Sequence, residues 1–382
     1  MITVARRQGG PAAAQVLDRV RARGTALRDE LAVDTRLSLA TVGRAVSQLT
    51  AARVLREARS RSRARGVGRP GIPVEIDDAF HATIGVHVGR TVLTVAVGDL
   101  AGRVLAQDLA RREAGDPPDL ADASRRAVQL LARLPGRRPL SVGAVGAWRD
   151  LGLAPGEVAA ELEELTGLRV SVGDHVAAVA AAEFFHRRSG TGGVTLYVYA
   201  RDTLGFAVAT DKGTHTEVSR VGSMAHLPTG SGLPCPCGRT GCLEVTAGDQ
   251  ALLRDARAAG LAPEGVEQLY AAATGPEPDE VVLGLLRARA RRLGAAAASV
   301  RDIVAPDRVV LVGQAHTGCP SVLEDVVAAY EEAGVVEAPV SFTRFGSGIQ
   351  ATAACTLALG PVYDDPLGVL AGEASGVRSL VD

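Results

Sequence analysis

The sequence predicts an α/β protein with a small N-terminal domain of helices and a β-hairpin, followed by a larger α/β body with two lobes. The charge distribution supports this division. Residues 1–70 contain 15 arginines and 5 acidic residues, whereas the rest of the 382-residue chain contains 27 basic and 38 acidic residues. The hydrophobic pattern changes at the same place, from closely spaced helices to an alternation of strands and helices. A small basic head on an acidic body is typical of a protein that meets a polyanion, although a merely solvated arginine-rich face is the alternative.

The head, residues 1–76, shows the pattern of two helices joined by a tight turn. Helices are predicted over residues 11–23, 26–33 and 39–52. Thr25 and Ser38 are the expected N-caps of the second and third helices. In the third helix Val42, Val46 and Leu49 recur at the spacing of one buried face. Helix, turn and helix in this order indicate a helix-turn-helix.

The outward face of the third helix carries the residues that we expect to meet DNA. In a helix-turn-helix the N-terminal half of this helix enters the major groove. The residues predicted to contact DNA here are Ser38, Ala40, Thr41, Arg44 and Ser47. Arg44 has the reach for a guanine edge or a phosphate, and Thr41 for a base or the backbone. The turn position that often holds glycine is Arg36, where a left-handed conformation would cost about 1 kcal/mol unless the turn is of another type.

An arginine-rich segment follows and is predicted to be a wing. Val54 and Leu55 start a short strand, residues 72–76 alternate as its return partner, and Gly-Arg-Pro-Gly closes the segment between them. Arg65 and Arg69 are the wing arginines expected to reach a narrow minor groove. The alternative is a disordered basic linker. The head as a whole therefore predicts a winged helix-turn-helix that binds double-stranded DNA.

The body alternates strands and helices in two cycles. In the first, strands are predicted over residues 82–88, 92–97, 104–106, 141–147 and 170–172, and helices over 120–134, 155–165 and 176–187. In the second, strands are predicted over 194–200, 204–210, 308–312 and 340–342, and helices over 250–259, 266–274, 279–304, 320–334 and 348–359. We expect a first lobe of residues 77–192, completed by the C-terminal helix at about 348–382, and a second lobe of residues 193–347. With no apolar run that could cross a bilayer and no signal peptide, we expect a cytoplasmic protein without a membrane partner.

A cysteine cluster in the second lobe has the composition of a metal site. Three of the chain's five cysteines fall within eight residues, and a histidine precedes them across a glycine- and proline-rich run. Four such ligands in one loop are what a tetrahedral zinc ion needs. The predicted structural zinc site consists of His226, Cys235, Cys237 and Cys242. A disulfide or three unpaired thiols is the alternative, which an odd number of clustered cysteines disfavours.

The residues of this loop carry a resemblance to a known family. His226 followed by Cys-Pro-Cys-Gly-x-x-Gly-Cys-Leu-Glu resembles the zinc signature of the ROK family (repressors, open reading frames, kinases). The winged head ending in Gly-Arg-Pro-Gly, the first strand Gly85-Val-x-Val-Gly-x-Thr91 and the pair Gly346-x-Gly348 support the resemblance to its repressor branch. The resemblance implies an actin-like ATPase or sugar-kinase fold for the two-lobed body, and homodimers or homotetramers.

The nucleotide motifs depart from those of ROK kinases. His87 stands where the kinases carry an aspartate for the magnesium region, and Arg90 replaces a turn glycine. Histidine does not supply the hard carboxylate oxygen that magnesium prefers. The second phosphate turn reads Arg201-Asp202-Thr203-Leu204-Gly205, and Gly313-Gln314-Ala315 lacks a glycine cluster. Arginine and aspartate prevent the close backbone approach that phosphate cradling needs. We therefore expect no catalytic residues and no enzymatic activity.

The sugar-binding positions that the resemblance implies are only partly kept. Asp174, His226 and Glu244 match the family's polar positions, whereas Gly173 and Ser223 do not. Asp174 has an equally good alternative role as the N-cap of the following helix. A polyol is recognised by pairing many hydroxyls, so we expect another effector, sugar-like or not, or none.

These observations lead to one main hypothesis and two rivals. The hypothesis is a DNA-binding transcriptional regulator, with repression favoured by the resemblance, that binds a palindromic or inverted-repeat operator as a homodimer or homotetramer. One rival is a sugar kinase with a regulatory head, which would turn over ATP. The other is a ligand-independent DNA-binding scaffold, which would respond to no small molecule.

Overall fold

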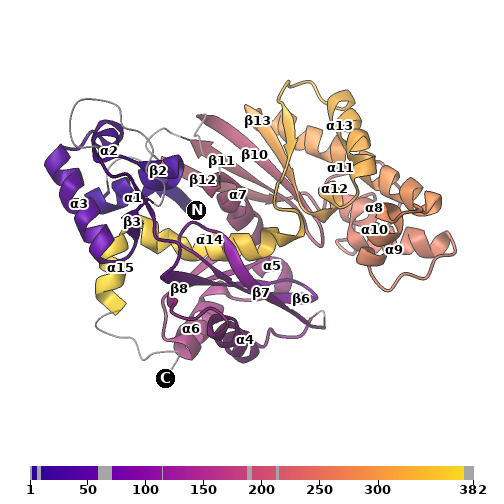
Figure 1. Ribbon diagram of the computed structural model, residues 1–382. Helices are drawn as coiled ribbons and strands as arrows, with labels where there is room; N and C mark the ends of the chain where they lie inside the picture. Colours follow the sequence, from indigo (N-terminus) through magenta and orange to yellow (C-terminus); the bar gives the residue numbers. More distant parts are fainter. Residues whose placement is uncertain are drawn as a thin grey trace. The chain divides into compact units, whose positions relative to one another are not determined.

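The computed structural model describes residues 2–6, 10–58, 71–113, 115–186, 192–211 and 215–373. Two compact units divide the chain. The first comprises Met1–Gly192, Asp211–Val218 and Gln350–Asp382, and the second comprises Gly193–Thr210 and Ser219–Ile349. Both units combine helices with sheets (Figure 1), so the predicted α/β class is confirmed.

The head consists of three helices and a small sheet at the start of the first unit. The helices are α1 (Ala12–Arg23), α2 (Arg28–Thr35) and α3 (Leu39–Ala51). The antiparallel strands β2 (Thr25–Ala26), β4 (Val74–Ile76) and β3 (Leu55–Glu57) form a sheet in that spatial order. Val42, Val46 and Leu49 are fully buried, as their periodicity predicts.

The start of the second helix was predicted wrongly. Thr25 does not cap it, because Thr25 lies in β2 opposite Glu75. The N-cap is Leu27, and its backbone N–H donates to the Glu30 carboxylate at 2.9 Å. Pairing with a strand 50 residues away overrides the local capping preference of threonine.

The first lobe is built on a five-stranded mixed sheet with the order β7-β6-β5-β8-β9. Its strands are β5 (His81–Val88), β6 (Val92–Gly98), β7 (Val104–Arg111), β8 (Arg138–Gly146) and β9 (Val170–Asp174). The helices between and after them are α4 (Leu120–Ala132), α5 (Trp148–Leu151), α6 (Pro155–Thr166) and α7 (His175–Phe185). Side chains of α4 and α6 share one apolar core with those of the sheet, among them Ile84, Val86 and Leu162.

The C-terminal helix α14 (Ile349–Asp364) lies directly on the same sheet, because glycines line the contact (Figure 1). A Cβ on Gly143 would stand 2.2 Å from the carbonyl oxygen of Ala354, and one on Gly85 would stand 2.7 Å from the backbone nitrogen of Cys355. After α14, helix α15 (Pro366–Glu373) contacts α1 and α3 of the head. The C-terminal part of the chain therefore joins the head and the first lobe.

The N-terminal strand was not predicted. β1 (Ile2–Arg6) pairs antiparallel with β12 (His215–Ser223), with Ile2 opposite Val218. A five-residue strand whose partner lies more than 200 residues away carries no local signal such as a hairpin turn.

The second unit contains a sheet with strands in the order β11-β10-β13-β14 and a cluster of helices. The strands are β10 (Gly193–Ala200), β11 (Leu204–Asp211), β13 (Arg308–Val312) and β14 (Val340–Phe342). The helices are α8 (Leu243–Ala247), α9 (Asp249–Ala258), α10 (Val266–Thr274), α11 (Glu280–Val304), α12 (Gln314–Thr317) and α13 (Leu323–Glu332), with 3-10 turns at Pro320–Val322 and Gly346–Gly348. One core of mainly Leu, Val and Ala holds this unit together. Within the described ranges, no helix has the length and apolar character needed to cross a membrane.

Candidate nucleic-acid interface and candidate metal centre

The N-terminus of α3 is organised by its own polar side chains. The Ser38 hydroxyl accepts a hydrogen bond from the Thr41 backbone N–H at 3.1 Å, which confirms Ser38 as the N-cap. The two hydroxyls also lie 2.9 Å apart. An Arg44 Nη donates to the Thr41 hydroxyl at 3.4 Å. These contacts hold the first turn of α3 in shape and place the Arg44 guanidinium beside it.

The structure separates the two faces of α3 as the sequence predicts. Ser38, Ala40, Arg44 and Ser47 are exposed and Thr41 is half-buried, whereas Val42, Val46 and Leu49 are buried. The predicted DNA-contacting residues of α3 therefore lie on one accessible surface. Arg65 and Arg69, the wing residues, fall outside the described residues. The strands on either side of the predicted wing, β3 and β4, are paired antiparallel, with Leu55 opposite Ile76.

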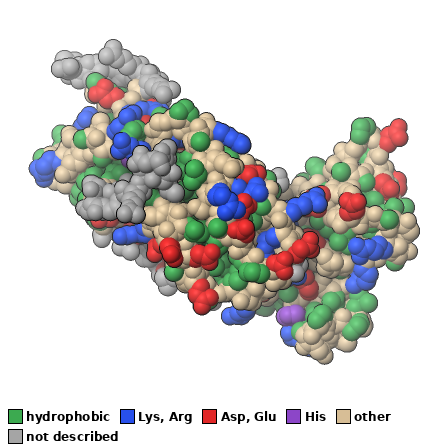
Figure 2. All heavy atoms as spheres, turned by 90° about the horizontal axis from the view of Figure 1, so that it is seen from below, with side chains coloured by type: hydrophobic (Ala, Val, Ile, Leu, Met, Phe, Trp, Pro, Cys, Tyr) green, Lys and Arg blue, Asp and Glu red, His purple; other side chains and the backbone are tan. Residues whose placement is uncertain are grey.

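The arginines of the head differ in how far their charge is compensated. Arg21, Arg23, Arg53 and Arg56 each form an ion pair with an acidic residue. Basic and acidic side chains are interspersed over the face shown in Figure 2. By contrast, Arg28, Arg36 and Arg44 make no ion pair with any residue of the described ranges. These three arginines belong to α2, the turn and α3, so guanidinium groups without an acidic partner lie on the helix-turn-helix, although the Asp29 carboxylate beside Arg28 makes no ion pair with a described residue either.

Three candidate DNA contacts were missed or undervalued by the sequence reasoning. Arg36, considered only as a possible strained turn residue, is left-handed at φ 58° and ψ 26° and is exposed at the end of α2. Gln48 is exposed four residues after Arg44, a spacing that helical periodicity alone would have revealed. Leu39, at the start of α3, is 59% exposed, and an apolar side chain there suits the methyl group of a thymine.

The four predicted metal ligands come together in one loop of the second unit. The ligand atoms of His226, Cys235, Cys237 and Cys242 all lie within 4.8 Å of one another. The Cys235 sulfur is 3.8 Å from His226 Nδ1, and the Cys237 and Cys242 sulfurs are 3.7 Å apart. Sulfurs that bind one zinc ion at about 2.3 Å in a tetrahedron lie about 3.8 Å apart. The five cysteines are free, and 3.7 Å is far too long for a disulfide.

Backbone geometry explains how a short loop brings these ligands together. Isolated antiparallel β-bridges pair Pro228 with Cys242 and Pro234 with Thr240. The second pair lies within the first, so the loop forms two nested turns. Gly241 has a φ of 67°, and a Cβ there would lie 2.3 Å from the carbonyl oxygen of Ser231. Glycine is therefore required at this point of the loop.

The electrostatics of the cluster favour a thiolate. Hydrogen bonds from the backbone and side chain of Arg239 lower the pKa of Cys237 to about 6. Burial raises the pKa of Cys242 to about 11. The Cys237 thiol therefore loses its proton more readily than an ordinary cysteine, and a thiolate is the form that binds a metal ion.

The three residues that the resemblance assigns to a sugar site belong to different units. Asp174, in the first unit, caps α7, and its carboxylate accepts from the N–H groups of Val176 at 2.9 Å and Ala177 at 3.5 Å. The alternative that we kept open for Asp174 is therefore a role that this residue does perform. His226 and Glu244 lie in the second unit, where the Glu244 N–H donates to the Ala225 carbonyl at 2.8 Å.

His87, which the resemblance places where ROK kinases carry an aspartate, contacts a second histidine. His87 Nε2 lies 2.7 Å from His175 Nδ1, and both side chains are buried. Two imidazoles at this point supply no carboxylate oxygen for magnesium. His175 was not singled out from the sequence, because its contact with His87 spans 88 residues of chain.

Comparisons with known proteins point to one family. A family model described as "ROK family" matches residues 83–346. The transcriptional regulators Mb0495 of Mycobacterium bovis and Rv0485 of Mycobacterium tuberculosis are both 37% identical over 392 residues, which cover 94% of this chain and 87% of theirs.

Solved structures show the same fold. A ROK family transcriptional regulator, described as a homolog of the E. coli MLC protein, superposes with a TM-score of 0.70 at 20% identity, covering 95% of this chain and 98% of its own. A ROK hexokinase from Thermus thermophilus gives a TM-score of 0.56 at 26% identity, covering 74% and 99%. The regulator structure thus matches the head as well as the body of this chain. The kinase structure matches a smaller share of the chain. From the family model and the identity to curated relatives, the chain belongs to the ROK family.

Proposed function

We propose that this protein is a sequence-specific DNA-binding transcriptional regulator, most simply a repressor, acting in the cytoplasm. The observation that carries the proposal is the helix-turn-helix itself, whose recognition helix exposes Arg44 and whose Arg28 and Arg36 make no ion pair with the described residues. The relatives that match 94% of the chain at 37% identity are named transcriptional regulators. Because the match covers 94% of the chain, it extends into the N-terminal domain, and this supports extending the relatives' function to this protein.

In this proposal residues 1–76 form the DNA-binding domain, and α3 lies in the major groove. Arg44 pairs with a guanine, while Ser38, Ala40, Thr41 and Ser47 border the bases or the backbone. Arg65 and Arg69 of the wing reach the minor groove. A homodimer or homotetramer places one head on each half-site of a palindromic or inverted-repeat operator.

The body, residues 77–382, serves in oligomerisation and ligand sensing and does not transfer phosphate. Its two lobes would be residues 77–192 with about 348–382, and residues 193–347. The buried pair of His87 and His175 supports catalytic inactivity, because it occupies the place of a magnesium-binding carboxylate. Asp174, His226 and Glu244 remain as polar positions of the family's sugar site, and we keep them as its vestige. ATP turnover with any hexose would contradict this part of the proposal.

We also propose that the Cys3His loop holds a structural zinc ion. The spacing of the ligand atoms and the low pKa of Cys237 support it. Four protein ligands leave no open position for a substrate, which is typical of a structural site. Elemental analysis of the purified protein should give one zinc per chain, and the absence of bound metal would refute the assignment.

The function is tested by selecting the full-length protein against a random duplex library. A regulator of this kind enriches a sequence with two related half-sites, with a spacing set by the oligomer. If no sequence is enriched and retention depends only on salt concentration, the arginines of the head form a non-specific polyanion surface and the proposal fails.

A further inference from the structure

A cavity lies between the head and the first lobe, both within the first unit. Its volume is about 290 Å³. Helix α1 and strands β3 and β4 line it from the head, and the turn after β6 and the end of α7 line it from the lobe. None of the residues proposed above for DNA, metal or sugar binding lines this cavity.

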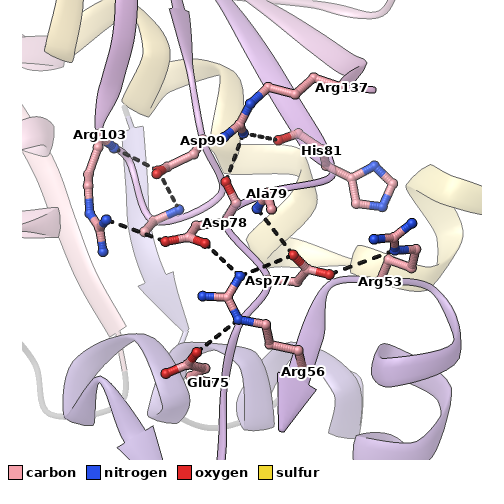
Figure 3. A network of polar contacts seen from close by, with 11 residues as sticks. Arg53, Arg56, Glu75, Asp77, Asp78, Ala79, His81, Asp99, Arg103 and Arg137 are labelled. Carbon is pink, nitrogen blue, oxygen red and sulfur yellow. Dashed lines mark hydrogen bonds and ion pairs between the residues drawn. The ribbon is translucent and has the colours of Figure 1, made fainter. Parts of the chain in front are cut away.

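The polar wall of the cavity is a chain of arginines and carboxylates (Figure 3). Arg56 Nε donates to Glu75 at 2.8 Å, and one of its terminal nitrogens donates to Asp78 at 2.7 Å. Arg103 donates to the other oxygen of Asp78 at 3.3 Å. Because both guanidinium groups bind the same carboxylate, they lie side by side on the wall.

These groups keep unused hydrogen-bonding capacity. Arg56 Nη2, and Nε and Nη2 of Arg103, donate to no residue that the structure describes. Glu75 Oε2 likewise accepts from none of them. Guanidinium and carboxylate groups carry more sites than one ion pair fills, and the three side chains that keep spare donors or a spare acceptor all line the same cavity.

The charge of the wall is balanced. Arg56 and Arg103 face Glu75 and Asp78. Behind the wall, Asp18 pairs with the lining residue Arg21 at 2.7 Å. Asp77, 3.5 Å from Arg56, pairs with Arg53 at 3.8 Å, so these further charges also cancel. The remaining ionisable lining group is His186. A ligand with a single charge of either sign would therefore leave one charge uncompensated, whereas a ligand that carries both signs would not.

We propose that this cavity binds a small zwitterion of the α-amino acid class. The ligand carboxylate accepts from the spare nitrogens of Arg56 and Arg103, and its ammonium group donates to Glu75. The apolar lining residues Val20, Ile76 and Phe185 leave room for a short side chain. Since the walls come from both the head and the lobe, a bound ligand favours the arrangement in which the two are docked.

The test is a thermal-shift and calorimetric screen of the full-length protein with the twenty amino acids, without DNA. Propionate and ethylamine at the same ionic strength serve as probes that carry only one of the two charges. We expect saturable stabilisation by at least one amino acid and none by either single-charge probe. Stabilisation by propionate equal to that by the amino acid would overturn the zwitterion assignment, and no saturable binding in the whole panel would overturn the site.

A variant and its control locate the binding. The Arg103 side chain is 68% exposed, so Arg103→Gln should leave the fold intact and weaken the affinity at least tenfold. Arg125→Gln removes a similarly exposed arginine on α4 and should bind as the wild type does. Equal affinity of Arg103→Gln and wild type would place the ligand elsewhere and refute the proposal.

An effect of this ligand on gene regulation rests on the proposed function, whereas binding of the ligand to the cavity does not. Binding measured without DNA tests the site. The operator affinity with and without the amino acid tests the coupling, and an unchanged operator affinity would refute the coupling while leaving a measured site in place.

Discussion

Replacing Arg44 by alanine should weaken operator binding without weakening the fold. In the structure its guanidinium is exposed and makes one long contact, 3.4 Å to the Thr41 hydroxyl. Losing an exposed side chain with no ion pair should change the free energy of unfolding by less than about 0.5 kcal/mol. Any large loss of DNA affinity would then report a lost contact with DNA.

The expected loss follows from the geometry of α3. A bidentate arginine–guanine contact contributes about 1–3 kcal/mol, which corresponds to roughly 5- to 150-fold in affinity for each half-site. A dimer on two half-sites loses the contact twice, so about 2–6 kcal/mol is expected for the whole operator. Fluorescence anisotropy with the selected operator and with an unrelated duplex, both at fixed salt, measures this loss.

The same titrations at several salt concentrations distinguish a base contact from a phosphate contact. A base contact should relax specificity at one position of the half-site, whereas a phosphate contact should weaken all sequences alike and lower the salt slope by about one per half-site. Arg125→Ala on α4 is the matched control, and its affinity should equal that of the wild type. An unchanged operator affinity of Arg44→Ala would refute the assignment of α3 as the recognition helix surface.

Three further predictions concern the metal loop, pH and the turn of the head. Cys237→Ser should lose bound zinc and lower the melting temperature, whereas Cys319→Ala should keep its zinc by elemental analysis; a Cys237→Ser protein with full zinc content would contradict the ligand set. Burial and the nearby Arg289 lower the pKa of His316 to about 3. The folded state therefore keeps this imidazole neutral, and stability should fall as the pH drops from 6.5 toward 3, by about 2 kcal/mol at pH 5. His316→Leu should lack that part of the pH dependence in urea denaturation, and an identical pH profile would contradict the shift. Arg36→Gly should raise the free energy of unfolding by up to about 1 kcal/mol, because glycine relieves the left-handed strain and loses part of that gain to the entropy of the unfolded state. Urea denaturation measures this change, and a lower midpoint than that of the wild type would contradict the strain at Arg36.

Local sequence signals determined the parts of the protein whose partners lie close along the chain. The cap Ser38 and the period of Val42, Val46 and Leu49 define α3 within a dozen residues, and the structure has these features where they were expected. The metal loop was predictable for the same reason, since its cysteines and its glycines belong to one short segment. Departures from kinase motifs at His87 and Arg90 were also visible without coordinates, because they depend on residue chemistry alone.

Only the tertiary structure decided the features that join distant segments. The local sequence predicts Thr25 to be a helix cap, whereas in the structure it pairs with Glu75 of β4. Strand β1 is identifiable only through its pairing with β12. His87 meets His175, Gly143 meets α14, and the cavity beside Arg56 and Arg103 assembles from the head and the lobe. Capping and helical periodicity depend on side chains that are only a few residues apart in the sequence. Strand pairing, close backbone approach and shared cavities depend on which distant surfaces bury each other, which no single stretch of the sequence specifies.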